Sequence, residues 1–127
     1  MNKDNFEDKL KQIKTEDIIW FVYIGIIFLS WYANFLETDY YQNKSLESKK
    51  KYQSIMIIIF SILLIVYGYF LKSSFSDMQN LKVSDSDKKK VLVYASFLGS
   101  LLIFISGIIF LSIAIYDDNL DVEIAFN

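Results

Sequence analysis

Ser30, Asn34 and Glu37 are the polar residues with the clearest capacity for chemistry within or beside an apolar part of this chain. Their spacing of four and three residues places them on one face of a helix. An amide and a carboxylate there offer oxygen atoms to a cation or a polar ligand. The same groups also join helices in membranes, because a polar side chain in hydrocarbon needs a hydrogen-bond partner. We expect the second role, with Asn34 turned toward another helix or another copy of the protein.

The acidic C-terminal tail, 117–127, also carries candidate ligands. Residues 117–123 place oxygen-bearing side chains at every second position, a spacing that resembles the start of an EF-hand calcium loop. The sixth position of that loop needs glycine for a sharp turn, whereas Val122 stands there. We therefore predict no specific metal site in the tail.

Three residue types that supply much of enzyme chemistry are missing, since the chain has no histidine, no cysteine and no arginine. Zinc, haem and iron–sulfur sites lose their usual ligands. Histidine, the side chain that most often transfers protons near neutral pH, is also missing. A phosphate group would have to be bound by lysine or by backbone amides. The net charge of -2 argues against a nucleic-acid partner. We predict no cofactor, no small-molecule substrate and no enzymatic activity.

These side chains belong to a chain with three long apolar runs, 18–36, 54–71 and 91–116, none of which contains an acidic or basic residue. A membrane-spanning helix needs about 20 mostly apolar residues. Inside hydrocarbon the backbone amides must bond within their own helix, so each run predicts one transmembrane helix. The sequence therefore predicts an all-α membrane protein with a single domain, 1–127, in which three transmembrane helices form a small bundle.

The N-terminal tail, 1–17, carries Phe6, Leu10 and Ile13 at a helical spacing, with lysines on the other faces. This pattern predicts a short amphipathic helix that lies along the membrane surface. Thr15 is followed by two acidic residues, and this combination predicts the N-cap at which the first transmembrane helix begins.

Serine residues mark two further helix starts. Ser45 precedes the second helix, and the sequence S-D-S-D from Ser84 onward matches a capping box ahead of the third. Apolar residues keep a helical spacing beyond Lys72, so the second helix should extend past the membrane by one or two turns. The connection that remains is short, which predicts an antiparallel hairpin of the second and third helices.

Lysine counts predict the orientation in the membrane. The N-terminal tail and the loop between the second and third helices share one side and carry nine lysines, against four on the other side. Lysine-rich loops stay in the cytoplasm, so the N-terminus should be cytoplasmic and the C-terminal tail outside. Nineteen isoleucines, thirteen lysines and no arginine or proline indicate an AT-rich genome, and we expect the plasma membrane of a bacterium.

Small residues recur every seven positions in the second and third helices. In lipid, such a repeat predicts close, left-handed packing of two helices. One antiparallel register places all six residues opposite one another. The expected pairs of this helix-packing seam are Ser54 with Ala114, Ser61 with Gly107, and Gly68 with Ser100. A second patch of small residues on the third helix is expected to meet the first helix or a partner, and it comprises Ala95, Ser96, Gly99 and Ser100.

The leading interpretation is a small non-enzymatic membrane subunit that associates with itself or with a larger membrane protein. The alternative, from size and number of spans, is a holin-like or bacteriocin-immunity-like protein. A lipid-directed enzyme is the third hypothesis, and the three-span layout is similar to that of bacterial diacylglycerol kinase. The acidic catalytic stretch on the helices of that family has no equivalent here, so the similarity covers the layout alone.

Overall fold

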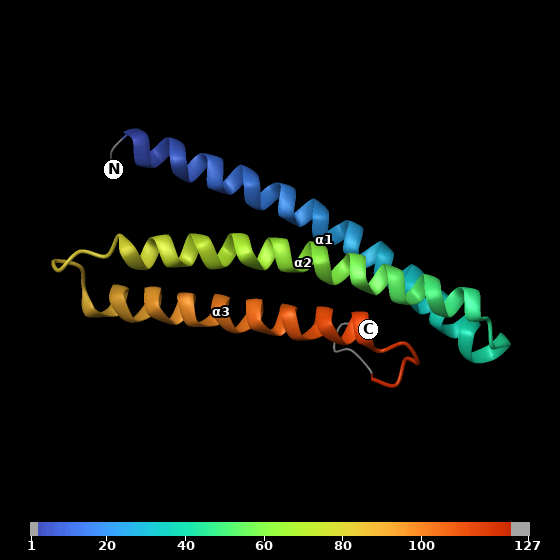
Figure 1. Cartoon of the computed structure of the whole chain (residues 1–127). Coiled ribbons are helices and arrows are strands. Elements are labelled where there is room, and N and C mark those ends of the chain that lie inside the picture. Colours follow the sequence, from blue (N-terminus) through green and yellow to red (C-terminus); the bar gives the residue numbers. More distant parts are fainter. Residues whose placement is uncertain (1–2, 123–127) are drawn as a thin grey trace.

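Three helices make up most of the protein, for which the computed structural model describes residues 3–122 (Figure 1). Helix α1 comprises Lys3–Asn43, α2 comprises Leu46–Gln79 and α3 comprises Asp87–Tyr116. All three are long and apolar enough to cross a membrane, which confirms the predicted all-α architecture. The predicted antiparallel hairpin of α2 and α3 is also present, and α2 continues about two turns past Lys72, as expected. At 1.5 Å per residue the helices measure about 60, 50 and 45 Å, so each is longer than the roughly 30 Å of hydrocarbon.

Helix α1 is unbroken, and its N-terminal part is not a separate interfacial helix. The expectation that Thr15 caps a helix is wrong. Its Oγ1 atom donates to the carbonyl oxygen of Lys11 at 3.1 Å, which is the bond of a threonine inside a helix. The helix continues through this point because no proline or glycine precedes Gly25. The apolar stripe of the N-terminal tail is exposed along this continuous helix.

The other two helix starts show how neighbouring residues select the cap. Ser45 is the N-cap of α2, as predicted, and its side chain accepts a backbone amide of the first turn at 3.2 Å. The N-cap of α3 is Ser86 and not the predicted Ser84. Asp85 explains the difference, because its carboxylate accepts the amide of Lys82 at 2.7 Å and closes a turn before the helix begins.

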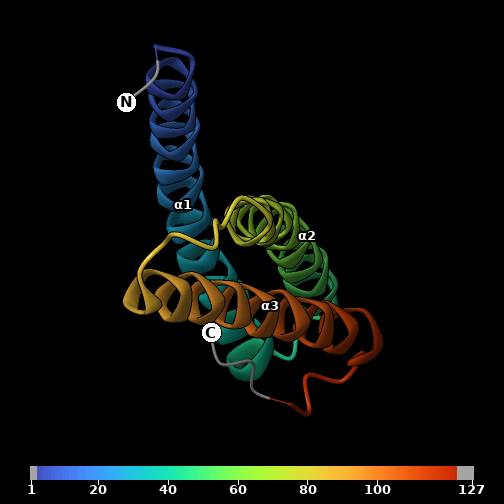
Figure 2. The same cartoon turned by 90° about the vertical axis from the view of Figure 1, so that its left-hand side faces the viewer.

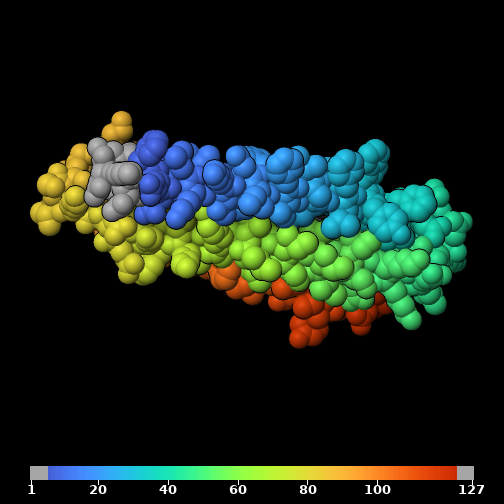
Figure 3. All heavy atoms as spheres, turned by 90° about the horizontal axis from the view of Figure 1, so that it is seen from above, coloured from blue at the N-terminus to red at the C-terminus, as the bar shows by residue number. Residues whose placement is uncertain are grey.

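Helix α2 packs against both α1 and α3, whereas the backbones of α1 and α3 do not approach each other closely in the described chain. Figure 2 shows the N-terminal part of α1 standing away from the other helices, and seen from above α2 lies between the other two (Figure 3). Most buried side chains of α2 recur at spacings of three and four residues, and the full set is Ser48, Tyr52, Met56, Ile59, Phe60, Leu63, Val66 and Ser74. Helix α1 buries a stripe at spacings of seven and three residues: Ile19, Ile26, Ala33 and Leu36. Among the described residues α3 buries just Gly107 and Ala114. The result is an open bundle centred on α2.

Large apolar side chains cover the outer faces of this bundle. Phe21 is 74% exposed, Trp31 is 72% exposed and Ile65 is 75% exposed. Such surfaces are stable in lipid and costly in water. They fit a multi-pass membrane protein whose helices contact the bilayer.

Candidate functional site

Among the glycines, Gly107 has the tightest surroundings. A Cβ atom added to it would lie 3.1 Å from Cδ2 of Tyr67 and 3.2 Å from Cδ1 of Leu64. Large side chains of α2 therefore fill the space that glycine leaves on α3. This arrangement differs from the expected pairing of Gly107 with Ser61, because a large side chain set against glycine makes more van der Waals contacts than serine does.

The other residues of the expected seam lie at different depths in the interface. Ala114 is buried, and a Cβ atom on Gly68 would lie 3.5 Å from a ring carbon of Phe104 rather than against Ser100. Ser61 is partly buried, whereas Ser54 is exposed. Three of the α2 residues that contact α3 lie one position before a member of the small-residue stripe: Gln53, Phe60 and Tyr67.

The second small-residue patch divides between two surfaces of α3. Ala95 is exposed, and a Cβ atom added to Gly99 would meet nothing within 4 Å. Ser96 and Ser100 instead line a groove that faces α1. Ala95 and Gly99 thus lie on an open surface, whereas Ser96, which is exposed, and Ser100, which is partly buried, line the groove.

The polar stripe of α1 does not converge on one site. Asn34 is exposed and Ser30 is partly buried. Glu37 accepts a hydrogen bond from the hydroxyl of Tyr52 and so links α1 to α2. A shared role in ligand binding for these three residues therefore has no geometric support, whereas Glu37 contributes to helix packing.

Gln53 joins α2 to the end of α3. Its Nε2 atom donates to the carbonyl oxygens of Ala114 at 3.2 Å and Ile115 at 3.0 Å, and to the carboxylate of Asp118 at 3.1 Å. The last turn of a helix leaves carbonyl groups without partners in the helix, and here one side chain of a neighbouring helix satisfies two of them. We call this end of the molecule, with the α1–α2 turn and the tail after α3, the closed end.

The described part of the acidic tail, 117–122, folds back at the closed end instead of forming an open ligand set. The carboxylate of Asp117 accepts the backbone amides of Asp121 and Val122, both at 2.9 Å. Lys49 donates to Asn119 at 3.2 Å, and these bonds use the oxygen atoms that resemble calcium ligands. Within the described residues no group of three acidic side chains is placed to hold a metal ion.

Asp39 ties the end of α1 to the start of α2. Its carboxylate accepts hydrogen bonds from the Ser48 hydroxyl and, at 2.6 Å, from the Asn43 amide. The bond from Ser48 makes the larger contribution to a lowered pKa of Asp39, and the bond from Asn43 adds to it. Asp39 is therefore held in its charged form at neutral pH.

At the other end α1 diverges from α2 and α3 (Figures 1 and 2). A groove lies among the side chains of the three helices there. The inner part of this groove has a volume of about 390 Å³ and touches all three helices. Much of its lining is polar: Gln12, Tyr23, Tyr67, Ser73, Ser74 and Ser100. Gln12 donates to Ser73 at 3.3 Å, the one side-chain hydrogen bond that joins α1 to α2 in this half of the described chain.

The outer part of the groove continues to the α2–α3 loop, with a volume of about 340 Å³. Asp77 and Ser96 line both parts, so the two volumes adjoin each other. Lys88, Lys89 and Leu92 line the outer part alone. We call the whole feature the open-end groove.

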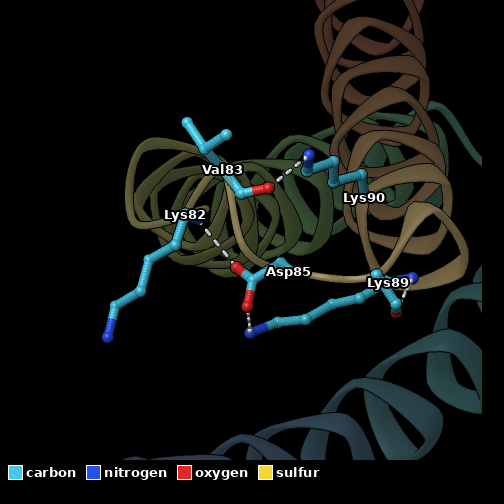
Figure 4. A network of polar contacts seen from close by, with 6 residues as sticks. Lys82, Val83, Asp85, Lys89 and Lys90 are labelled. Atoms are coloured by element: carbon cyan, nitrogen blue, oxygen red, sulfur yellow. Dashed lines mark hydrogen bonds and ion pairs between the residues drawn. The ribbon is translucent and has the colours of Figure 1, made fainter.

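Figure 4 shows how the loop beside this groove uses its lysines. Lys89 pairs with the carboxylate of Asp85 at 3.2 Å, and Lys90 donates to the carbonyl oxygen of Val83 at 3.2 Å. The amide of Lys82 also donates to Asp85, and this bond is the main cause of its lowered pKa. Lys88 makes no hydrogen bond or ion pair with the described residues, and neither does Asp77 across the groove.

Ser96 and Ser100 were expected from the sequence to pack against a helix, and the other groove residues were not predicted to form a site. Part of the pattern is nevertheless visible in the sequence. Lys88, Leu92, Ser96 and Ser100 follow one another at intervals of four, which places them on one face of a helix. Gln53 and Gln12 each stand alone beside an apolar run, and no repeated spacing marks either residue. The arrangement combines charged groups at the mouth with hydroxyl groups farther in.

No protein family, curated protein or solved structure was found to match this chain.

Proposed function

We propose that this chain is a non-enzymatic subunit of the bacterial plasma membrane that packs one face of α3 against a helix of another chain. The observation that carries the proposal is the open small-residue surface at Ala95 and Gly99, where an added Cβ at Gly99 meets nothing within 4 Å. Small residues let helix backbones approach closely in lipid, and this approach is a principal source of helix association there. The partner helix belongs to a second copy of the chain or to a larger membrane protein.

Site-specific crosslinking tests this association, since the chain has no native cysteine. Gly99→Cys and Leu98→Cys lie at nearly the same depth on α3, about 100° apart around the helix. In native membranes, a thiol-directed photo-crosslinker should capture a second polypeptide from Gly99→Cys and not from Leu98→Cys. Equal capture from both positions, or capture from neither, would contradict the proposal.

The orientation proposed for this subunit places the N-terminus in the cytoplasm and the tail after α3 outside. Lys44 in the α1–α2 turn and Lys82 in the α2–α3 loop are both exposed and lie at opposite ends of the bundle. A membrane-impermeant thiol reagent should label Lys44→Cys in intact cells and should label Lys82→Cys after permeabilisation alone. The reverse pattern would overturn the orientation and leave the crosslinking result unaffected.

A further inference from the structure

The open-end groove occupies one end of the membrane-spanning region and not its full length. The apolar run of α3 begins at Val91, so Ser96 and Ser100 lie about 8 and 14 Å farther along the helix axis. The hydrocarbon core is about 30 Å thick, so the groove reaches roughly through one leaflet. A partner helix crosses both leaflets and would find this groove along half of its length, whereas a lipid molecule occupies a single leaflet.

The charges at the mouth of the groove are two unpaired groups of opposite sign. Lys88 and Asp77 both line the outer part, yet they form no ion pair within 4 Å. The neighbouring lysines, Lys89 and Lys90, are occupied by Asp85 and by the carbonyl oxygen of Val83 (Figure 4). A ligand that carries both a negative and a positive group can bridge Lys88 and Asp77.

Hydroxyl and apolar side chains line the groove beyond its charged mouth. The hydroxyl groups of Ser73 and Ser96 can donate to ester carbonyl oxygens, whereas the Ser74 hydroxyl already donates to the carbonyl oxygen of Leu71 at 3.1 Å. Phe70, Leu92 and Ile103 offer apolar surface to an acyl chain. The groove therefore combines the charged, hydroxyl and apolar contacts that a phospholipid can use.

We propose that the open-end groove binds one phospholipid whose headgroup carries a primary amine. The phosphate lies at Lys88, which supplies a lysine contact in a chain without arginine. The ammonium group donates to the carboxylate of Asp77, and the acyl chains leave the groove toward the bilayer. The site is distinct from the outward surface at Ala95 and Gly99, so its test is independent of the subunit proposal.

Native mass spectrometry of the purified full-length protein in mild detergent tests the site with three lipids of identical acyl chains. These are phosphatidylethanolamine, phosphatidylcholine and phosphatidylglycerol. The choline group has no N–H to donate to Asp77, so phosphatidylethanolamine should bind about tenfold more tightly, as the loss of one charge-assisted hydrogen bond predicts. Equal retention of all three lipids, or preference for the anionic phosphatidylglycerol, would overturn the proposal.

Two variants assign the headgroup contacts. Asp77→Asn should remove the preference for ethanolamine over choline, and Lys88→Gln should weaken both lipids about tenfold. Lys50→Gln and Asp121→Asn change exposed residues at the closed end and should leave all three affinities unchanged. Retention of the ethanolamine preference in Asp77→Asn would refute the assignment. Crosslinking of Ser96→Cys to a second polypeptide in native membranes would also refute it, because a protein would then fill the groove.

Discussion

The two ends of this molecule are held together in different ways. At the closed end, Gln53 alone donates to three oxygen atoms of α3 and the tail, and Glu37 links α1 to α2. At the open end, one hydrogen bond from Gln12 to Ser73 joins α1 to α2 within the described chain, and a groove separates the helices.

The difference shows which part of a small membrane protein has polar groups available to bind a ligand. Polar groups near hydrocarbon are costly unless they are hydrogen-bonded. At the closed end these groups satisfy one another, which favours a single fixed arrangement of the helices. At the open end the groove leaves Lys88 and Asp77 without partners in the described chain, so a ligand can satisfy them.

Among the variants that test this comparison, Gly107→Leu should reduce stability most, because Gly107 lies in the close α2–α3 contact between the two ends. The new Cβ would already lie 3.1 Å from Tyr67 and 3.2 Å from Leu64, so the helices must separate or repack. Overpacking of this kind costs about 1 to 3 kcal/mol. Thermal unfolding in one detergent should therefore show a clearly lower melting temperature for this variant.

Gly25→Leu is the matched control for that change. An added Cβ at Gly25 meets nothing within 4 Å, and leucine is a better helix former than glycine. Its melting temperature should equal or exceed that of the wild type. If the two glycine variants melted at the same temperature, the tight α2–α3 contact at Gly107 would not exist.

Two substitutions with smaller expected effects on stability compare the two ends directly. Gln53→Met removes the two N–H donors that serve three oxygen atoms and leaves two carbonyl groups of α3 without this partner, which should lower the free energy of unfolding by about 1 to 2 kcal/mol. Gln12→Met removes a single long bond and should cost less than about 0.5 kcal/mol. Both values can be measured by denaturant titration in mixed micelles. Equal losses would mean that the closed end is no better secured than the open end.

The smallest effect concerns the pH dependence of the closed end. Hydrogen bonds from Ser48 and Asn43 lower the pKa of Asp39, so its contribution to stability is fully present above the unfolded-state pKa of about 3.9. That contribution is lost as the pH falls through the lower folded-state pKa. Between about pH 5 and pH 3 the melting temperature should fall more for the wild type than for Asp39→Asn. Parallel curves for the two proteins would rule out this role of Asp39.

The fold could be predicted from the sequence wherever one physical requirement dominated. An apolar run of membrane-spanning length has no stable alternative to a helix in hydrocarbon, and all three runs are helical. Local signals were less decisive. Thr15 suits both an N-cap and a helix interior, and the unbroken run of helix formers selected the interior. Ser84 and Ser86 both suit a cap, and the turn closed by Asp85 selected Ser86.

The candidate site was harder to predict, because a seven-residue repeat does not show which of several repeating sets of side chains faces the neighbouring helix. Ser61 and Gly68 repeat every seven residues, but so do Phe60 and Tyr67, which make the contacts with α3. The four-residue repeat that includes Lys88 was visible in the sequence. Nothing in the sequence indicates that α1 diverges from its neighbours at that depth, and this divergence is what creates the groove.

The unbroken course of α1 also has a mechanical consequence. Among the residues whose burial is described, Ile19 is the buried residue of α1 nearest the N-terminus, and the helix extends beyond it for about 24 Å. On this charged arm, Gln12 makes the one side-chain hydrogen bond to α2 in the described chain. Because no proline or glycine precedes Gly25, a tilt of the arm would be carried into the membrane-spanning part of the same helix instead of being absorbed at a hinge.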